Sequence, residues 1–347
     1  MMSLETREIA GIKTCEFKGE NGPQSPAALY GRGTDDPLAL HKFKVIEGSE
    51  PSYNNWCDVD RLLQTMTHIS AAWKLNYGKA PFIAIGGKHG NPCGAAVSYD
   101  QPCTTAQKMV QGDKRAIFGG LVMINFPMTE ALAGIMADVM PNGKTMFDGV
   151  IAPKFMEESV KILSRAKGKC RLMENQNLYS CSDVLDNASR FRYVRGGFLA
   201  QPNYTYILDF KDHEMQVFGK RCKSDEKDLL LAWAIGCTSN SNTITLVNDG
   251  MLIGNGVGQQ DRVGAAELAV KRACDAGHIL KLDGAVAYSD SFFPFTDAVD
   301  VLIRHGIKAI FSTSGSINDG LVQQLCIDRG VTLYQLPDSK ARGFFGH

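Results

Sequence analysis

The chain has 347 residues, of which 44% are hydrophobic and 21% charged, and this composition is typical of a soluble globular protein with a substantial core. Lysine plus arginine and aspartate plus glutamate both number 37, so the zero net charge favours neither nucleic acid nor an anionic membrane as partner. The N-terminus lacks the apolar segment of a signal peptide, and no run reaches 18 apolar residues, which predicts a cytoplasmic protein. The ten cysteines include no C-x-x-C pair, which favours reduced thiols over a structural zinc site.

Taken in chain order, apolar periodicity predicts helices that alternate with strands, which indicates an α/β fold without an evident internal repeat. In the first half it predicts helices at 58–73, 128–139 and 153–167, strands at 82–85 and 115–124, and a short apolar run at 148–152. The irregular stretch 170–200 suggests two domains, 1–190 and 191–347. In the second half it predicts helices at 224–238, 262–276 and 297–305, a hairpin at 243–256, and a strand–loop–helix–strand unit at 308–336.

The segment GGKHGNPCG, residues 86–94, places a lysine beside a histidine where an apolar strand meets glycines and a proline. These residues are expected to end the strand, so that Lys88 and His89 can face one pocket. A neutral histidine can act as a base, and a neighbouring ammonium would disfavour its protonation while stabilising negative charge on a substrate. The pair is therefore a candidate catalytic site, whereas the other six histidines are interpreted as surface or structural residues.

Two polar motifs surround the predicted hairpin. SNSN (239–242) is either a turn former or a segment that orients a substrate through an asparagine amide. In IGNGVGQQDR (253–262) the third glycine of a dinucleotide-binding fingerprint would fall on Asp261, so that function is disfavoured. The motif instead predicts a tight glycine turn that presents Arg262 and a helix N-terminus to an anion.

Two further motifs lie near the C-terminal end. SDSFFPFTD (289–297) contains three phenylalanines that are most often core residues, but beside Asp297 they also suit a flat heterocycle with paired N–H donors. TSGSIND (313–319) is either an ordinary helix cap or a ligand-binding loop at the carboxyl end of a strand.

In this order, the motifs resemble the transformylase half of the bifunctional enzymes that join 5-aminoimidazole-4-carboxamide ribotide (AICAR) formyltransferase to IMP cyclohydrolase. KHGNPCG matches the family's K-H-x-N-P-C-G, and SYNN, DGVIAP, SN, GxGQQ-x-R, SD-x-FFPF-x-D and SGS fit in register between about Leu29 and His347. The resemblance implies two tandem cytidine-deaminase-like three-layer α/β/α domains and an intertwined homodimer with active sites at the subunit interface. Because the family's cyclohydrolase domain has no counterpart here, a stand-alone formyltransferase is expected.

The same resemblance implies transfer of a formyl group from N10-formyltetrahydrofolate to the 5-amino group of AICAR in purine biosynthesis. Lys88, His89 and Asn242 match the family's catalytic residues. The positions that match the AICAR site are Tyr30, Gly149, Arg262, Phe292, Arg342, Phe345 and His347. Those that match the folate side are Phe292, Pro294, Phe295, Asp297 and Ser316. A monovalent cation such as potassium is a further expectation, and zinc is not expected.

The chain departs from the family at three positions. The arginine before Tyr-Gly is Leu29 here, an aspartate near the ribose aligns with Asn175, and a tail arginine aligns with Gly343 beside Arg342. A related aminoimidazole substrate and a catalytically silent paralogue that binds purine intermediates are therefore alternatives. A zinc-dependent deaminase would share the fold, but it needs H-x-E and P-C-x-x-C, and neither Cys93 nor Cys103 begins such a pair.

Overall fold

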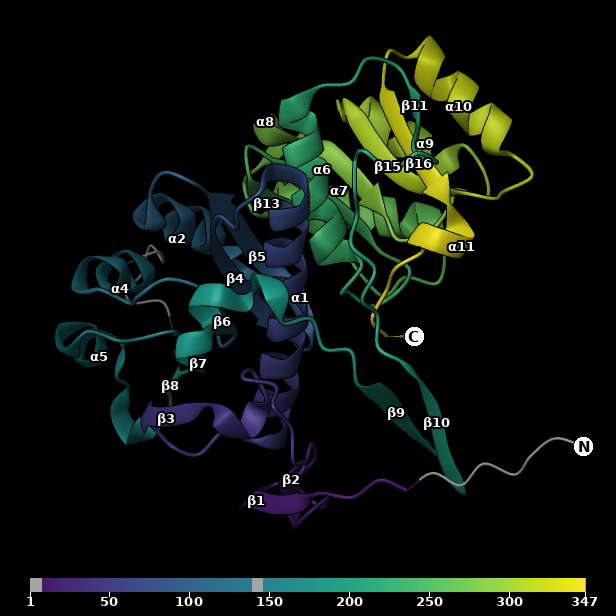
Figure 1. Ribbon diagram of the computed structural model, residues 1–347. Helices are drawn as coiled ribbons and strands as arrows, with labels where there is room; N and C mark the ends of the chain where they lie inside the picture. The colour runs from purple at the N-terminus through teal and green to yellow at the C-terminus, as the bar shows by residue number, and fades with distance from the viewer. Residues whose placement is uncertain (1–7, 139–145, 347) are drawn as a thin grey trace, which may run out of the picture.

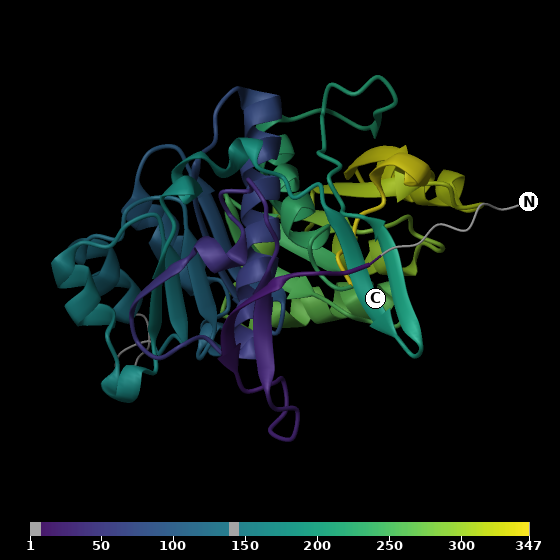
Figure 2. The same cartoon turned by 60° about the horizontal axis from the view of Figure 1, so that its bottom comes forward.

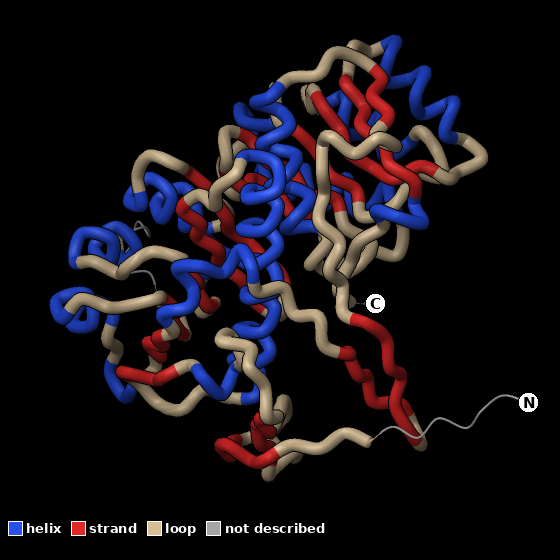
Figure 3. The backbone as a smooth tube through the Cα atoms, viewed as in Figure 1, coloured by secondary structure: helices blue, strands red, loops and turns tan. Residues whose placement is uncertain are grey.

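The computed structural model describes residues 8–138 and 146–346, which form a mixed sheet of 12 strands with helices on both faces (Figures 1 and 3). The strand order is β11-β16-β15-β14-β12-β13-β5-β4-β6-β7-β8-β3. Two antiparallel ribbons lie outside this sheet, β1 (Ile12–Phe17) with β2 (Ala27–Gly31) and β9 (Ser189–Val194) with β10 (Gly197–Pro202). The predicted α/β fold class is confirmed. None of the described helices is long and apolar enough to cross a membrane.

The first half of the sheet carries helices α1 to α5. Its strands are β3 (Lys44–Glu47), β4 (Phe82–Lys88), β5 (Asn91–Ser98), β6 (Leu121–Ile124), β7 (Gly149–Ala152) and β8 (Arg171–Glu174). Its helices are α1 (Tyr53–Tyr77), α2 (Pro102–Gln111), α3 (Lys114–Ile117), α4 (Glu130–Ala137) and α5 (Glu157–Leu163), with the short 3-10 segments η1 (Leu40–Lys42), η2 (Ala166–Gly168) and η3 (Gln176–Asp183).

The second half carries helices α6 to α11. Its strands are β11 (Gln216–Phe218), β12 (Ile244–Asn248), β13 (Met251–Gly256), β14 (Val286–Ser289), β15 (Ala309–Ser314) and β16 (Thr332–Pro337). Its helices are α6 (Lys223–Gly236), α7 (Arg262–Asp275), α8 (Ile279–Leu282), α9 (Asp297–Arg304), α10 (Asp319–Asp328) and α11 (Asp338–Ala341).

The two halves share one topology, although the sequence shows no repeat. Each begins with a helix and an antiparallel hairpin, α1–β4–β5 and α6–β12–β13, and continues with three more strands linked by helices. In each half the first of these strands runs antiparallel to the hairpin, and the next two add in parallel. The halves join where β13 pairs with β5 at Met251 and Ala96. The repeated units span 53–174 and 223–337, and the predicted boundary near 190 lies inside β9.

One hydrophobic core extends across both halves on the face that α1 and α6 cover together (Figure 1). Side chains alternate along each strand, so Ile83 and Ile85 of β4 face this core and Ala84 faces the other side. The opposite face has a separate core in each half, under α2 and α4 in the first and under α7 and α9 in the second. The shared core fixes the two halves against each other.

The boundaries of several elements follow from capping residues. Helix α1 begins earlier than the predicted 58–73 because Ser52 and Asn55 form a reciprocal capping box, and it ends at Gly78, whose φ is 81°. The strand predicted over 115–124 is wrong in its first part, where Asp113 caps α3 by accepting a hydrogen bond from Ala116 N at 2.9 Å. The stretch 170–200, which was expected to be irregular, contains β8, β9 and β10.

Candidate active site

Lys88 and His89 lie at the tip of the β4–β5 hairpin. The prediction that this strand stops at residue 85 is wrong, because β4 continues to Lys88 and Gly86 lies inside it. A Cβ at Gly86 would come within 2.3 Å of Ile117 Cδ1, so this glycine permits close packing of α3 and does not end the strand. The turn itself is formed by His89 and Gly90, with φ values of 53° and 72°, as a two-residue hairpin turn requires.

Three hydrogen bonds fix this turn. Asp58 of α1 accepts the Gly90 N–H at 2.6 Å, and Lys88 Nζ donates to the Phe118 carbonyl at 2.9 Å. Asn91 Nδ2 donates to the His89 carbonyl at 3.1 Å. Burial raises the pKa of Asp58, and the Gly90 N–H opposes this shift. The backbone of the turn is therefore held, while the His89 side chain is exposed.

A cavity of about 400 Å³ opens beside the pair. Three cationic side chains line its wall, namely Lys88, Arg115 and Arg272. Arg272 Nη1 also forms an ion pair with Asp113 Oδ2 at 3.5 Å. Burial raises the pKa of the Cys93 thiol in this wall to about 12, so it is protonated at neutral pH and is a poor nucleophile. The described residues that line the cavity include neither Asn242 nor Arg262.

Asn242 lies in the loop between α6 and β12 and forms three hydrogen bonds with the backbone of Gln259. Its Nδ2 and its backbone N–H donate to the Gln259 carbonyl at 2.9 and 3.1 Å, and Gln259 N donates back to the Asn242 carbonyl at 3.2 Å. The peptide bond between Ser241 and Asn242 is cis. These contacts join the SNSN segment to the glycine turn after β13, so two of the sequence motifs form one structural unit.

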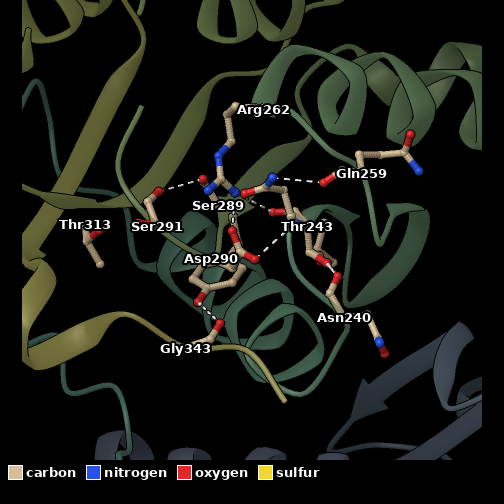
Figure 4. Close-up of polar contacts among 12 residues, drawn as sticks. Asn240, Thr243, Gln259, Arg262, Ser289, Asp290, Ser291, Thr313 and Gly343 are labelled. Atoms are coloured by element: carbon tan, nitrogen blue, oxygen red, sulfur yellow. Dashed lines mark hydrogen bonds and ion pairs between the residues drawn. The ribbon is translucent and has the colours of Figure 1, made fainter. Parts of the chain in front are cut away.

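Arg262 is the first residue of α7, and Asp261 caps this helix. The guanidinium is buried and paired with Asp290, whose other carboxylate oxygen accepts the Thr243 N–H at 3.1 Å (Figure 4). Burial raises the pKa of Asp290, and Arg262 opposes this shift. In this structure the anion next to Arg262 is a carboxylate of the same chain, and binding of a ligand anion by Arg262 stays a prediction.

The loops expected on the folate side meet at the carboxyl ends of β14, β15 and β16. Asn318 Nδ2 donates to the Pro294 carbonyl at 2.6 Å, and Asp338 accepts from Ser291 and Thr313 hydroxyls at 2.9 and 2.6 Å. Ligands of open α/β sheets bind at this strand edge.

The residues of these two loops differ in burial. Phe293 is a core residue, 1% exposed, whereas Phe295 is 62% exposed and Phe292 is half-buried. Asp297 is exposed at the start of α9, and Ser316 accepts the Asn318 N–H at 3.1 Å.

The C-terminal tail packs against the SNSN segment. Phe345 N donates to the Ser239 carbonyl at 3.0 Å, and Ser241 N donates to the Gly346 carbonyl at 3.1 Å. The Phe345 ring lies between the Arg61 and Arg190 guanidinium carbons, at 3.8 and 3.6 Å from its centroid. Figure 2 shows the tail beside the β9–β10 ribbon, which carries Arg190.

The remaining predicted residues are more scattered. Arg342 forms an ion pair with Asp338 at 2.6 Å, and His347 lies outside the described residues. Gly149 is buried in β7, where it pairs with Leu121, which in turn pairs with Gly87 beside the Lys88 turn. Tyr30 is 60% exposed on the β1–β2 ribbon.

Sequence reasoning missed the residues that support the site, namely Asp58, Arg61, Asn91 and Arg190. Asn91 stands within the KHGNPCG motif and could have been singled out by its position. Asp58 and Arg61 are three residues apart on a helix, which puts them on one face, but ordinary surface helices show the same pattern. In the part of the chain that the structure describes, no cluster of three or more histidine, cysteine, aspartate or glutamate residues could hold a metal ion.

Comparison with known sequences gives a consistent family. The family model described as "AICARFT/IMPCHase bienzyme" matches residues 8–272. Proteins named "Bifunctional purine biosynthesis protein PurH" are similar, with 32% identity over 322 residues in Anoxybacillus flavithermus and 31% over 332 residues in Polynucleobacter asymbioticus. These alignments cover 91% and 95% of this chain but only 56% and 59% of the relatives, so the chain spans little more than half their length. The chain belongs to the AICARFT/IMPCHase bienzyme family.

Proposed function

We propose that this protein transfers the formyl group of N10-formyltetrahydrofolate to the 5-amino group of AICAR, which yields formyl-AICAR for purine (IMP) biosynthesis. The observation that carries the proposal is the Lys88–His89 pair, held on a two-residue turn beside a cationic cavity in a chain of this family. The similar proteins are named for purine biosynthesis, which agrees with this substrate class.

In this mechanism His89 accepts the proton of the 5-amino group as its nitrogen bonds to the formyl carbon. The carbonyl electron pair moves to oxygen, and Lys88 stabilises the resulting oxyanion. When the oxyanion collapses, the bond from the formyl carbon to N10 breaks, and this nitrogen takes a proton from Lys88 or His89. General base catalysis contributes on the order of 10²–10⁴-fold, and a positioned oxyanion donor a similar amount.

Asn242 would hold the amine and the formyl group in line. Its side chain is already oriented by Gln259, which lowers the entropy lost when substrate binds. Arg262, Phe345 and Arg342 would contact AICAR together with Tyr30, Gly149, Phe292 and His347. Pro294, Phe295, Asp297 and Ser316 would contact the folate with Phe292. A requirement for a monovalent cation such as potassium stays a prediction without assigned ligands.

We further propose that the two repeated units are cytidine-deaminase-like domains, assigned to 1–190 and 191–347. Their identical order of hairpin and parallel strands supports this assignment.

An intertwined homodimer with active sites at the interface is part of the same proposal. The two ribbons project from the sheet and carry exposed apolar side chains, with Ile12 79%, Tyr193 82% and Leu199 60% exposed (Figure 2). Exposed apolar side chains on projecting strands suit burial against a second subunit. Lys88 and His89 also face a cavity that Asn242 does not line, so a complete site would combine the pair of one subunit with Asn242 of another.

Subunit mixing tests this arrangement. His89→Ala and Asn242→Ala chains are unfolded together and refolded, so that about half of the dimers are mixed. If each site takes His89 from one subunit and Asn242 from the other, a mixed dimer retains one intact site, and about a quarter of wild-type activity returns. Sites contained within one subunit would give no recovery.

The function itself is tested by the release of tetrahydrofolate from N10-formyltetrahydrofolate in the presence of AICAR, with the AICAR nucleoside as control. We expect release with the ribotide and much less with the nucleoside, which lacks the phosphate. Equal activity with both would favour a related aminoimidazole substrate, an alternative that the Arg342–Asp338 pair and the replacements at Leu29 and Gly343 support. No release with either would favour a silent paralogue.

A further inference from the structure

The two segments that carry the candidate catalytic residues come from different halves of the sheet, yet they touch. The His89 turn belongs to the β4–β5 hairpin, and Asn242 belongs to the loop after α6. The Asn240 N–H donates to Asn91 Oδ1 at 3.1 Å, and Asn91 Nδ2 donates to the His89 carbonyl at 3.1 Å. The side-chain amide of Asn91 therefore accepts a hydrogen bond from one segment and donates a hydrogen bond to the other.

Helix α1 also forms hydrogen bonds with both segments. Asp58 accepts the Gly90 N–H, while Arg61 donates to Asn240 Oδ1 at 3.0 Å and to the Thr238 carbonyl at 2.9 Å. Residues three apart lie on one face of a helix, so a single face of α1 holds both segments. Burial lowers the pKa of Arg61 to about 10, which still leaves the guanidinium charged at neutral pH.

We propose that Asn91 is a positioning residue, which fixes the His89 turn and the Asn240–Asn242 segment of one chain relative to each other, and so sets where each presents its catalytic group to the site that it serves. This inference rests on the proposed formyl transfer. The anchors on α1 fix each segment separately, whereas Asn91 joins them directly. In a dimer with interfacial sites, the same link would fix the two catalytic segments of each chain at one separation, and hence the geometry of both sites.

The geometry predicts an effect on turnover more than on substrate affinity. Asn91 binds backbone groups of both segments and leaves the His89 and Asn242 side chains in place. A displacement of about 1 Å between catalytic groups can cost on the order of 10²-fold in rate. The Asn91→Ala variant should therefore lower kcat by about 10- to 100-fold, with KM for AICAR within about twofold of wild type.

Three further variants separate positioning from general destabilisation. Asn91→Asp keeps the acceptor for Asn240 N–H and loses the donor to His89. Asp58→Asn weakens the anchor of the turn alone. Asn76→Ala is the matched control, because Asn76 also links α1 to a distant segment, donating to the Leu208 carbonyl at 2.8 Å and accepting from Phe210 N at 3.1 Å.

The experiment combines steady-state kinetics with amide hydrogen exchange on the full chain. In Asn91→Ala we expect faster exchange at Asn240 together with the loss of kcat; Asn91→Asp should retain protection at Asn240, and Asn76→Ala should retain kcat. The inference is overturned if Asn91→Ala keeps wild-type kcat, if Asn76→Ala loses as much, or if protection at Asn240 is unchanged. A wild-type protein that does not formylate AICAR would refute the proposed function instead, and the exchange result would still test the link.

Discussion

The Lys88–His89 turn and the Arg262–Asp290 pair are both charged, but they differ in what surrounds them. Lys88 and His89 lie at the edge of an open cavity, and the His89 side chain is exposed. Arg262 and Asp290 are buried, and each of them contacts the chain at Thr243. The turn leaves the His89 side chain exposed beside the cavity, whereas the buried pair holds the backbone at Thr243, next to Asn242.

Because of this difference, substitutions in the turn and in the buried pair should have different effects on activity and on stability. Removing a side chain from the turn should reduce activity and leave stability nearly unchanged, because little packing is lost. Removing one partner of the buried pair should reduce stability first, because an uncompensated charge remains inside the protein.

Substitution of the turn should be the most damaging change to activity. Lys88→Ala and His89→Ala should each lower kcat by on the order of 10²–10⁴-fold. The free energy of unfolding should change little for the exposed His89, within about 0.5 kcal/mol, and Lys88→Ala should cost about 0.5–1.5 kcal/mol because it also removes the hydrogen bond to the Phe118 carbonyl. The control is His213→Ala at a highly exposed histidine. Retention of most activity in either variant would remove that residue from the mechanism.

Substitution of the buried pair should cost the most stability. Asp290→Ala leaves the Arg262 guanidinium buried without its carboxylate, and a loss of about 3–5 kcal/mol in the free energy of unfolding is expected. Urea denaturation measures this loss, and Asp297→Ala, at an exposed carboxylate, is the matched control. Similar unfolding midpoints for the two variants would contradict the structural role of the pair.

Buried His68 should make the stability of the protein depend on pH. Burial lowers the pKa of His68 to about 4 from its ordinary 6.5, so the folded state favours the neutral ring. The stability that depends on neutral His68 is complete above pH 6.5 and falls by about 3 kcal/mol as pH decreases from 6.5 to 4.

Urea unfolding of wild type and His68→Gln across this range should therefore give curves that converge toward acid pH. A His68→Gln curve that runs parallel to wild type would show that this histidine titrates alike in the folded and unfolded states.

The smallest expected effect concerns the tail arginine. Arg342→Ala should raise KM for AICAR by about tenfold if the side chain leaves Asp338 to bind phosphate, since a charge-assisted hydrogen bond contributes roughly 1.5–3 kcal/mol. KM for the folate should not change. An unaltered KM for AICAR would mean that the Arg342–Asp338 ion pair is purely structural.

The sequence predicted the parts of the fold that depend on local pattern. The hairpin predicted at 243–256 is found as β12–β13, with its turn at Asp249 and Gly250, and α6, α7 and α9 agree with their apolar periodicity. The hairpin at Lys88 was missed because glycines inside a strand read as breaks, whereas Gly86 is required by the packing of Ile117. Whether a glycine ends a strand or permits close contact depends on a neighbour distant in sequence.

The candidate site shows the same limit. The motifs predicted Lys88, His89 and Arg262 as candidates because each stands among unusual neighbours, and the family resemblance added Asn242. The partners that hold them were not visible, because Asp58, Arg61 and Asp290 reach the site from other elements through the fold. Arg262 and Asp290 are 28 residues apart in the sequence, so no local pattern predicts their ion pair.

The most direct test of the account follows the formyl group itself. Wild-type protein is mixed with AICAR and N10-formyltetrahydrofolate labelled with ¹³C in the formyl group, and the products of a single turnover are identified by mass spectrometry. Formyl transfer to AICAR should give labelled formyl-AICAR and unlabelled tetrahydrofolate in equal amounts, with neither formed at a comparable rate by His89→Ala. Loss of label to formate, or no transfer to AICAR, would contradict it.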